Sequence, residues 1–247
     1  MSELVHHSGT QTLDLSALEP SPSSVATHRN RWGYFWAKRT IDLVAAIASL
    51  ALLAPLLLFI ALLIKLDSRG PVLFNQERVG YRWRTKQLCI FQFHKFRSMV
   101  HGCDQTIHEQ HVRTCLQAAT QGEDSNEQVL LTKIVHDSRV TRVGRILRRT
   151  SLDELPQLWN VIKGDMSLVG PRPVPVYEVA EYEPSHYQRL RATPGITGLW
   201  QVKGRGRTSI DDMVQLDIEY INNESAMLDL EILLLTIPAV VRGTGAG

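Results

Sequence analysis

The chain has 247 residues, of which 44% are apolar and 21% charged, and these proportions exclude a fibrous repeat or a wholly disordered protein. Its three cysteines form no CxxC pair, which excludes a disulfide framework and favours a reduced, cytosol-facing protein. The net charge of +2 is uneven: residues 1–30 carry −2, residues 31–100 carry +8 and residues 101–247 carry −4. The basic surplus surrounds the one strongly apolar segment, so it favours an anionic membrane surface or phosphate-bearing ligands over nucleic acid.

The first 66 residues are predicted to form a tail and then a membrane anchor. Residues 1–30 are rich in Ser, Thr and Pro, which predicts a disordered tail. Within the predicted anchor, residues 31–66, the 22 residues from Leu43 to Ile64 carry no charge. As a helix this segment would be about 33 Å long, enough to cross a bilayer. Aromatic and basic residues precede it, as at a membrane interface, and the lack of a polar stripe disfavours a buried core helix.

Pro55 interrupts the apolar segment and leaves parts of 12 and 9 residues, each reaching about half the thickness of a bilayer. Both flanks are basic, and the positive-inside rule places both in the cytoplasm. A re-entrant helix bent at Ala54 and Pro55 satisfies this rule, whereas a spanning helix does not. Because proline also occurs in spanning helices, both topologies stay open and the re-entrant one is preferred. The flanking basic residues are Arg29, Arg31, Lys38, Arg39, Lys65, Arg69, Arg78, Arg82, Arg84 and Lys86.

Residues 67–247 are predicted to form a cytosolic catalytic domain of the α+β class that is mostly helical. Alternating apolar residues predict a strand over 88–99, preceded by a strand or turn over 72–83. The segment 228–241 is apolar but too short to span, so it is expected to lie on the membrane or the core. The chain is therefore predicted to be a monotopic membrane protein with interfacial amphipathic helices. Further helices are expected over residues 139–149, 156–163, 176–192 and 209–222.

Four potential metal ligands, His101, His108, His111 and Cys115, fall near one face of a predicted helix. A zinc site there is one interpretation, but dedicated zinc sites have more closely spaced ligand pairs. An ordinary polar helix face is the other interpretation, and it is preferred.

The segment RRTSLDELPQLWN contains the strongest candidate for chemistry, the adjacent acids Asp153 and Glu154. One interpretation is structural, because Ser151 and Glu154 have the spacing of a capping box at a helix N-terminus. The other is functional. Arginines and a helix N-terminus would keep Asp153 ionised and would also suit a phosphate. An ionised carboxylate can attack phosphorus, and a neighbouring acid can hold Mg²⁺.

Several basic segments are candidates for binding phosphate. Lys95 and Arg97 lie in the predicted strand that ends in KFRSM. Arg172 stands between Pro171 and Pro173, in a stiff loop that suits a fixed contact to phosphate. The segment PGITGLWQVKGRGR, which contains Arg205, is glycine-rich and basic, and its glycines would allow close backbone approach or anion-binding nests.

Taken together, the ordered motifs resemble the bacterial sugar transferases, the monotopic polyprenyl-phosphate phosphoglycosyl transferases. The resemblance covers about residues 38–240 and rests on KRTIDL, APLLLFIALLIKLDSRGPVLFNQERVG, KFRSM, TRVGRILRRTSLDELPQLWNVIKGDMSLVGPRP, PGITGLWQVKGR, LDIEYI and LDLEILLLT. It implies transfer of a sugar 1-phosphate from a UDP-sugar to undecaprenyl phosphate, in the first membrane step of exopolysaccharide or related glycan synthesis.

The resemblance also implies roles for individual residues. Asp153 would be the nucleophile that forms an aspartyl-phosphosugar intermediate, and Glu154 would support it together with Mg²⁺, or Mn²⁺ in its place. Lys95 and Arg148 would bind phosphates, and the loop with Arg172 would bind the nucleotide sugar. The sequence departs from the family at Ala54, where many members have serine before the proline.

The expected location is the cytoplasmic face of the bacterial inner membrane, with membrane lipid, UDP-sugar and undecaprenyl phosphate as partners. No nucleic acid is expected, and a homodimer is compatible with the sequence. Two other functions stay open: a membrane scaffold without catalysis, and a glycosyltransferase that moves only the sugar and releases nucleoside diphosphate. The sequence does not specify the sugar.

Overall fold

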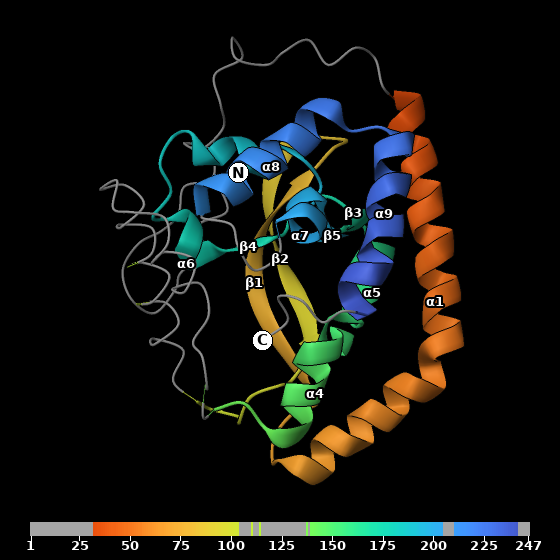
Figure 1. The fold of residues 1–247 in the computed structure, drawn as a ribbon, viewed down its shortest axis with the longest axis vertical. Coiled ribbons are helices and arrows are strands. Elements are labelled where there is room, and N and C mark those ends of the chain that lie inside the picture. The colour runs from red at the N-terminus through yellow and green to blue at the C-terminus, as the bar shows by residue number, and fades with distance from the viewer. Residues whose placement is uncertain are drawn as a thin grey trace.

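A long β-hairpin runs through the centre of the molecule (Figure 1). In it, β1 (Leu73–Arg82) pairs antiparallel with β2 (Gln87–Phe96), so both segments predicted from alternation are strands. A short strand, β4 (Val174–Pro175), extends the sheet on the other side of β1. A second, parallel pair consists of β3 (Ser167–Val169) and β5 (Gly195–Thr197). This computed structural model describes residues 32–103, 110, 114, 137, 139–204 and 210–241.

The N-terminal helix, α1 (Trp32–Asp67), has 36 residues and contains Pro55. It is one continuous helix that changes direction within its length (Figure 1). Within the described residues it is the one helix long and apolar enough to cross a membrane, and 11% of its most apolar stretch is buried. The alternative of a buried core helix is therefore wrong. The mixture of helix and sheet confirms the predicted fold class, and the apolar helix is suited to anchor the protein in a membrane.

The two halves of α1 pack on different parts of the domain. Ala46, in the first half, belongs to a buried cluster with Phe93 of β2 and Val161 of α5 (Gln157–Lys163). Ile60 and Ile64, in the second half, pack with Phe96 and with Leu147 of α4 (Arg142–Thr150). Since one straight rod follows a single direction, the bend lets both halves of α1 reach the domain.

The second half of the chain forms short helices joined by turns. The predicted helix over 176–192 is wrong: the chain forms α6 (Val176–Val179) and η3 (His186–Arg191) instead. Pro184 lies between them, and proline disfavours the helical conformation of the residue before it. The other predicted helices are confirmed, with the bounds of α4 and α5 given above, α8 (Ile210–Asn223) and α9 (Ala226–Val241).

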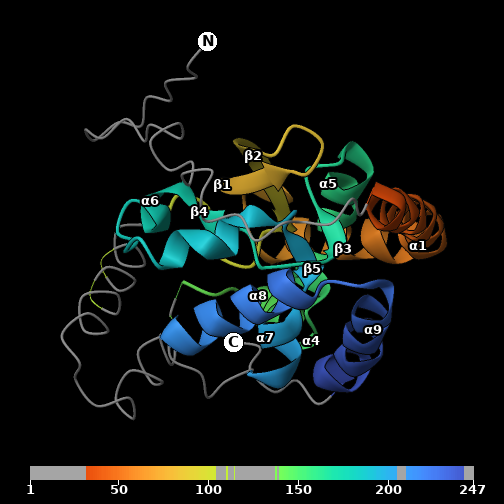
Figure 2. The ribbon, with the colours of Figure 1, turned by 90° about the horizontal axis from the view of Figure 1, so that it is seen from above.

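The C-terminal helices cover the parallel strand pair on one side (Figure 2). A buried cluster joins Val169 of β3 and Leu199 of α7 (Leu199–Lys203) to Tyr220 of α8 and Ile232 of α9. α9 lies beside α1 in both views, and the Lys38 Nζ to Asp229 Oδ2 distance of 2.8 Å joins the two helices.

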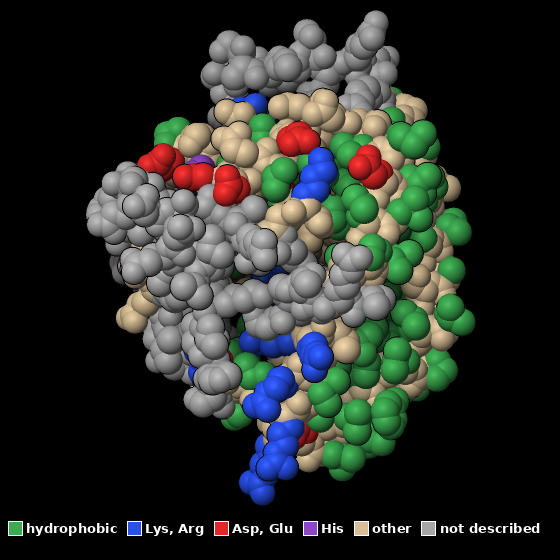
Figure 3. All heavy atoms as spheres, in the orientation of Figure 1, with side chains coloured by type: hydrophobic (Ala, Val, Ile, Leu, Met, Phe, Trp, Pro, Cys, Tyr) green, Lys and Arg blue, Asp and Glu red, His purple; other side chains and the backbone are tan. Residues whose placement is uncertain are grey.

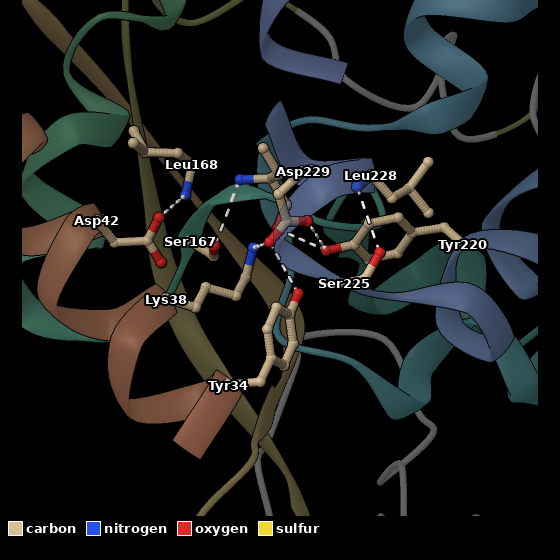
Figure 4. A network of polar contacts seen from close by, with 10 residues as sticks. Tyr34, Lys38, Asp42, Ser167, Leu168, Tyr220, Ser225, Leu228 and Asp229 are labelled. Carbon is tan, nitrogen blue, oxygen red and sulfur yellow. Dashed lines mark hydrogen bonds and ion pairs between the residues drawn. The ribbon is translucent and has the colours of Figure 1, made fainter. Parts of the chain in front are cut away.

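An ion pair in a buried polar network fixes α9 to α1 (Figure 4). Asp229 Oδ2 accepts hydrogen bonds from Tyr34 Oη at 2.7 Å and from Lys38 Nζ at 2.8 Å. Its other oxygen accepts one from Tyr220 Oη at 2.8 Å. The Asp229 carboxylate thus accepts three hydrogen bonds, and these compensate for burying its charge within an apolar helix.

The outer sides of α1 and α9 leave a broad apolar surface exposed, on the right of the molecule in Figure 3. A soluble monomer seldom exposes an apolar patch of this extent, so the surface favours contact with lipid or with another protein. Its most exposed members are Ile41, Val44, Ile47, Leu52, Leu58, Phe59, Leu62 and Leu66 of α1, and Met227, Leu230, Leu234 and Ile237 of α9.

Candidate active site

Asp153 lies in η2 (Leu152–Glu154), a single turn between α4 and α5. Ser151 ends α4 in the left-handed conformation, with φ of 56°, and so reverses the chain direction toward η2. Its side chain makes no capping hydrogen bond to η2, so the capping-box interpretation of Ser151 is wrong. Pro156 precedes α5 rather than forming its first residue. This tight turn leaves the Asp153 side chain 8% exposed.

Three cations from separate elements lie near enough to act on the charge of Asp153: Lys95 of β2, Arg148 of α4 and Arg172 of the loop between β3 and β4. Their charges lower the pKa of Asp153, as the sequence predicted. Burial and the neighbouring charge of Glu154 outweigh them, however, and raise that pKa to about 6. Asp153 is therefore ionised at neutral pH, and no hydrogen bond from the described side chains occupies its oxygens.

Lys95 is itself perturbed by this environment. Burial, aided by the positive charge of Arg78, lowers the pKa of Lys95 to about 8. The ammonium group lies 5.1 Å from the centre of the Phe74 ring, directly across the hairpin. Lys95 can thus supply a positive charge to a phosphate near neutral pH, and it loses that charge in mildly alkaline solution.

The loop that carries Arg172 is fixed on both sides, as its two prolines predicted. Pro171 and Pro173 are buried, and their carbonyl oxygens accept hydrogen bonds from Gly195 N at 2.8 Å and from Arg78 Nη1 at 2.7 Å. Arg172 Nη2 donates to Glu154 Oε1 at 3.0 Å. The second acid of the pair is therefore already joined to the predicted nucleotide-sugar loop.

Arg78 belongs to the site, although the sequence interpretation did not include it. It is 7% exposed, donates to Pro173 O and to Gln76 Oε1, and lies 3.9 Å above the centre of the Phe93 ring. Burial and the charge of Arg172 lower its pKa to about 10. Strand alternation could have indicated it, because the observed register places Arg78 and Lys95 on the same face of the hairpin.

Arg97 lies outside this cluster and has a different task. Its guanidinium donates hydrogen bonds to the carbonyl oxygens of Ile64, Ser68 and Arg69 at the end of α1. The last carbonyls of a helix have no partner within the helix, so Arg97 caps α1. The prediction that it binds phosphate finds no support in this arrangement. Its neighbour Ser98 does contact the cluster, because Ser98 Oγ accepts a hydrogen bond from Arg148 Nε at 2.9 Å.

The glycine-rich loop is explained in part by close packing of strands. A Cβ atom on Gly195 would lie 2.1 Å from Gly170 N, and one on Gly198 would lie 2.4 Å from Gly170 O. These glycines allow β3 and β5 to approach each other, and neither has the positive φ of an anion-binding nest. Arg205 lies outside the described residues, as do three of the predicted zinc ligands, His108, His111 and Cys115.

The acid pair fits a divalent cation held jointly with a substrate. Asp153 has a raised pKa, so an added positive charge would stabilise its ionised form, and Glu154 has one oxygen joined to Arg172. The described residues contain no cluster of three metal-ligating side chains. Mg²⁺ commonly binds one or two carboxylates together with substrate phosphates and water, so Asp153 and Glu154 are the residues that would hold it here.

An acid pair with three cations nearby, on a domain attached to a long apolar helix, is suited to a membrane-associated protein that acts on phosphate groups. Comparison with known proteins agrees with this class. The chain belongs to the bacterial sugar transferase family, whose profile matches residues 33–243.

Three similar proteins illustrate the family. The exopolysaccharide production protein ExoY of Rhizobium meliloti (strain 1021) is 40% identical over 85% of this chain and 88% of its own length. A UDP-glucose:undecaprenyl-phosphate glucose-1-phosphate transferase of Caulobacter vibrioides is 43% identical over 83% of the chain and 69% of its own length. The galactosyl transferase CpsE of Streptococcus agalactiae serotype III (strain NEM316) is 41% identical over 87% of the chain. The chain spans 44% of the length of that relative.

Proposed function

We propose that this protein transfers a sugar 1-phosphate from a UDP-sugar to undecaprenyl phosphate, as an early membrane step of exopolysaccharide synthesis. The observation that carries the proposal is the ionised Asp153 carboxylate, which faces Lys95, Arg148 and Arg172. Such a site binds the phosphates of a donor and presents an oxygen nucleophile to them. The names of the relatives support UDP-sugar and undecaprenyl phosphate as substrates, and they include both glucose and galactose.

The proposed mechanism has two displacements at one phosphorus atom. An oxygen of Asp153 attacks the phosphorus bonded to the sugar, and the bond from that phosphorus to UMP breaks. UMP leaves with the electron pair, and Lys95, Arg148 and Arg172 stabilise the negative charge that develops. An oxygen of undecaprenyl phosphate then attacks the same phosphorus. The bond to Asp153 breaks, which restores the carboxylate and releases undecaprenyl diphosphate sugar.

We propose Asp153 and Glu154 as the residues that hold Mg²⁺, with Mn²⁺ as a substitute. The ion would neutralise charge on the donor phosphates while they are bound. Glu154 has a second task in this proposal: through its 3.0 Å contact with Arg172 it orients the loop that binds the nucleotide sugar. Turnover should therefore stop in excess EDTA and return when Mg²⁺ is added.

We further propose that α1 is a re-entrant anchor on the cytoplasmic face of the bacterial inner membrane. Exposed basic residues lie near both ends of α1, and Figure 3 shows a group of basic side chains below the centre of the molecule, beside the apolar surface. Basic residues favour the cytoplasmic side, so a bent α1 with both ends at one interface satisfies them all. These residues are Arg82, Arg84 and Lys86 near the start of α1, and Lys65, Arg69, Arg142, Arg145 and Arg149 near its end.

The released nucleotide tests the proposed reaction. The purified full chain in detergent would be incubated with radiolabelled UDP-glucose or UDP-galactose, Mg²⁺ and undecaprenyl phosphate. We expect UMP, with some release before the lipid acceptor is added because the first displacement does not need it. Release of UDP would indicate transfer of the sugar alone. Absence of turnover with every UDP-sugar in a panel would favour the non-catalytic scaffold.

A further inference from the structure

A polar cavity lies near the tip of the hairpin, at the other end of the hairpin from Lys95. The tip pair Arg82 and Gln87 is eight residues along β2 from Lys95, or about 26 Å at the rise of a strand. The cavity has a volume of about 340 Å³ and opens between the hairpin tip, the first turns of α1 and the turn after α5. Its charged lining residues are Lys38, Arg39, Asp42, Arg82, Arg84, Lys163, Asp165 and Glu224.

The cations deep in this cavity already have partners. Lys38 pairs with Asp229 at 2.8 Å, within the network of Figure 4. Arg39 donates to the carbonyl oxygens of Val161 and Ile162 at the end of α5. These contacts already engage Lys38 and Arg39 within the protein.

The cations at the rim differ from those on the floor. Arg82 and Arg84 are exposed, and no carboxylate of the described residues pairs with either of them. The Arg84 guanidinium lies 4.5 Å from the centre of the Trp36 ring and 5.4 Å from that of Trp83, which holds it at the mouth of the cavity. Within the part of the chain that the structure describes, the rim therefore presents two guanidinium groups without a carboxylate partner, and guanidinium is the side-chain group best matched to phosphate oxygens.

The rim also lies where the apolar surface begins. Trp83 stacks on Phe35 at 5.4 Å with an interplanar angle of 12° and meets Trp32 and Trp36 edge to face. Trp32 and Trp36 are about half exposed, and the apolar outer face of α1 starts five residues later at Ile41. Tryptophan at the end of an apolar helix is typical of the level of lipid headgroups. An acyl chain along α1 would therefore bring its headgroup phosphate to Arg82 and Arg84.

We infer that the hairpin tip and the start of α1 form a binding site for the phosphate of an anionic phospholipid headgroup, separate from the acid pair. The inference rests on the membrane attachment proposed above. Bound lipid fixes the hairpin tip at the interface, and since the same hairpin carries Lys95 at its other end, it also orients the catalytic domain on the membrane.

Native mass spectrometry of the full chain in detergent tests this site, with short-chain phosphatidylglycerol as the probe. We expect one lipid to stay bound. The variant with Arg82→Gln and Arg84→Gln together should bind it about 25-fold more weakly, because each arginine contributes roughly a fivefold gain in affinity. Lys86→Gln is the matched control, because Lys86 is an exposed cation of the same tip that does not line the cavity. That variant should bind within about twofold of the unchanged protein.

Three results would overturn the inference. The first is that Lys86→Gln weakens lipid binding as much as the double arginine variant does, which would indicate attraction by diffuse charge. The second is that short-chain phosphatidylcholine binds as tightly as phosphatidylglycerol, and the third is that inorganic phosphate at the same concentration as the lipid displaces it. Flotation with neutral phosphatidylcholine vesicles tests the attachment by α1 separately. The double arginine variant should still float with these vesicles. If the unchanged chain fails to float, the membrane attachment itself is wrong, whatever the lipid-binding result.

Discussion

Asp153 holds its negative charge in a place where burial opposes it. Desolvation and the charge of Glu154 raise its pKa, whereas the charges of Lys95, Arg172 and Arg148 lower it. The result is a pKa of about 6. A purely structural acid in this turn would gain stability from its charge, whereas a raised pKa shows that the charge costs stability. Groups with strongly perturbed pKa values concentrate at functional sites, and this perturbation favours the chemical interpretation of the acid pair.

Replacing Asp153 with Asn separates chemistry from structure. The change keeps the shape of the side chain but removes the charged oxygen that attacks phosphorus. We expect turnover to fall by at least about a thousandfold. The melting temperature should stay the same or rise, because the ionised form is destabilised in the folded protein. A folded Asp153→Asn protein that keeps near-normal turnover would contradict the proposed nucleophile.

The rate should depend on pH in the form of a bell. Asp153 acts as the deprotonated form, so kcat/KM should rise as the pH rises through about 6. Lys95 binds phosphate as the protonated form, so kcat/KM should fall as the pH rises through about 8. Lys95→Arg keeps the positive charge at high pH and should shift the alkaline limb upward by at least one unit. An unchanged alkaline limb in Lys95→Arg would assign that limb to another group.

The sequence was sufficient to identify most of the cations near Asp153, but it could not show which distant residues each basic side chain contacts. Lys95, Arg148 and Arg172 could be identified because they lie in short motifs, and the structure brings all three together. Strand alternation places Arg97 on the same face as Lys95, whereas in the structure β2 ends at Phe96 and the Arg97 guanidinium contacts the end of α1. Arg78 was missed because its partner Pro173 is 95 residues away, beyond the reach of local patterns.

Among the elements, α1 and α4 are joined by a hydrogen bond that connects the anchor to the site. Asp67, the last residue of α1, accepts a hydrogen bond from Val143 N in the first turn of α4 at 3.0 Å. α4 also approaches the end of β2 so closely that a Cβ atom on Gly144 would lie 2.0 Å from Ser98 O. The end of α1 and the end of β2 together therefore set the position of Arg148 beside Asp153.

Removing the Asp67 carboxylate should loosen this junction. Asp67→Ala leaves Val143 N without its acceptor, which should reduce the free energy of unfolding by about 1 kcal/mol. We expect KM for the UDP-sugar to rise, because Arg148 becomes less well positioned. Denaturant unfolding in detergent and steady-state kinetics measure the two effects. Thr150→Ala is the control, since that hydroxyl donates only to carbonyls of its own helix and should leave KM unchanged.

We expect that Pro55, which lies inside α1, causes the change of direction of this helix. Proline removes the hydrogen bond to the carbonyl four residues earlier and clashes with that turn, which bends a helix. Pro55→Ala should straighten α1, so that Ala46 and Ile64 can no longer both pack on the domain. Activity should then fall although every residue of the site is intact, and Ala54→Ser should have little effect. A fully active Pro55→Ala protein would show that packing alone bends the helix.

The sequence predicted most elements because their apolar periodicity is local. The sequence-based prediction failed over 176–192. The polar residues there suggested one helix, but Pro184 divides the segment into α6 and η3. The prediction also left open whether α9 lies on the membrane or on the core, and the structure shows that α9 packs one side on the domain and leaves the other side exposed. Ile232 is fully buried whereas Met227 is 76% exposed, and Asp229 is accommodated by Lys38 from a helix 191 residues earlier in the chain.

At the scale of the whole molecule, the positions of the hairpin and of α1 define an orientation. The hairpin tip meets the start of α1 through Trp83, and the other end of the hairpin meets the end of α1 through Arg97. Both ends of α1 are thus attached to one rigid sheet, and the bend of the helix points away from it (Figure 1). This arrangement suits a helix that enters and leaves a bilayer on one side.

Cysteine labelling at both ends of α1 tests that orientation. Thr40 and Ser68 lie near the start and just past the end of the helix, and each would be changed to Cys in a protein whose natural cysteines are replaced by Ser. We expect a membrane-impermeant maleimide to label both positions from the cytoplasmic side, in inverted vesicles but not in intact spheroplasts. Leu58, which is 74% exposed in the second half of α1, serves as the control for the interior of the bilayer. Leu58→Cys should react in detergent and resist labelling from either side of the membrane, since a re-entrant helix keeps it among acyl chains.

Labelling of Thr40→Cys and Ser68→Cys from opposite sides would mean that α1 spans the bilayer. The hairpin could not then join both ends of the helix as it does here, and the re-entrant anchor would have to be abandoned.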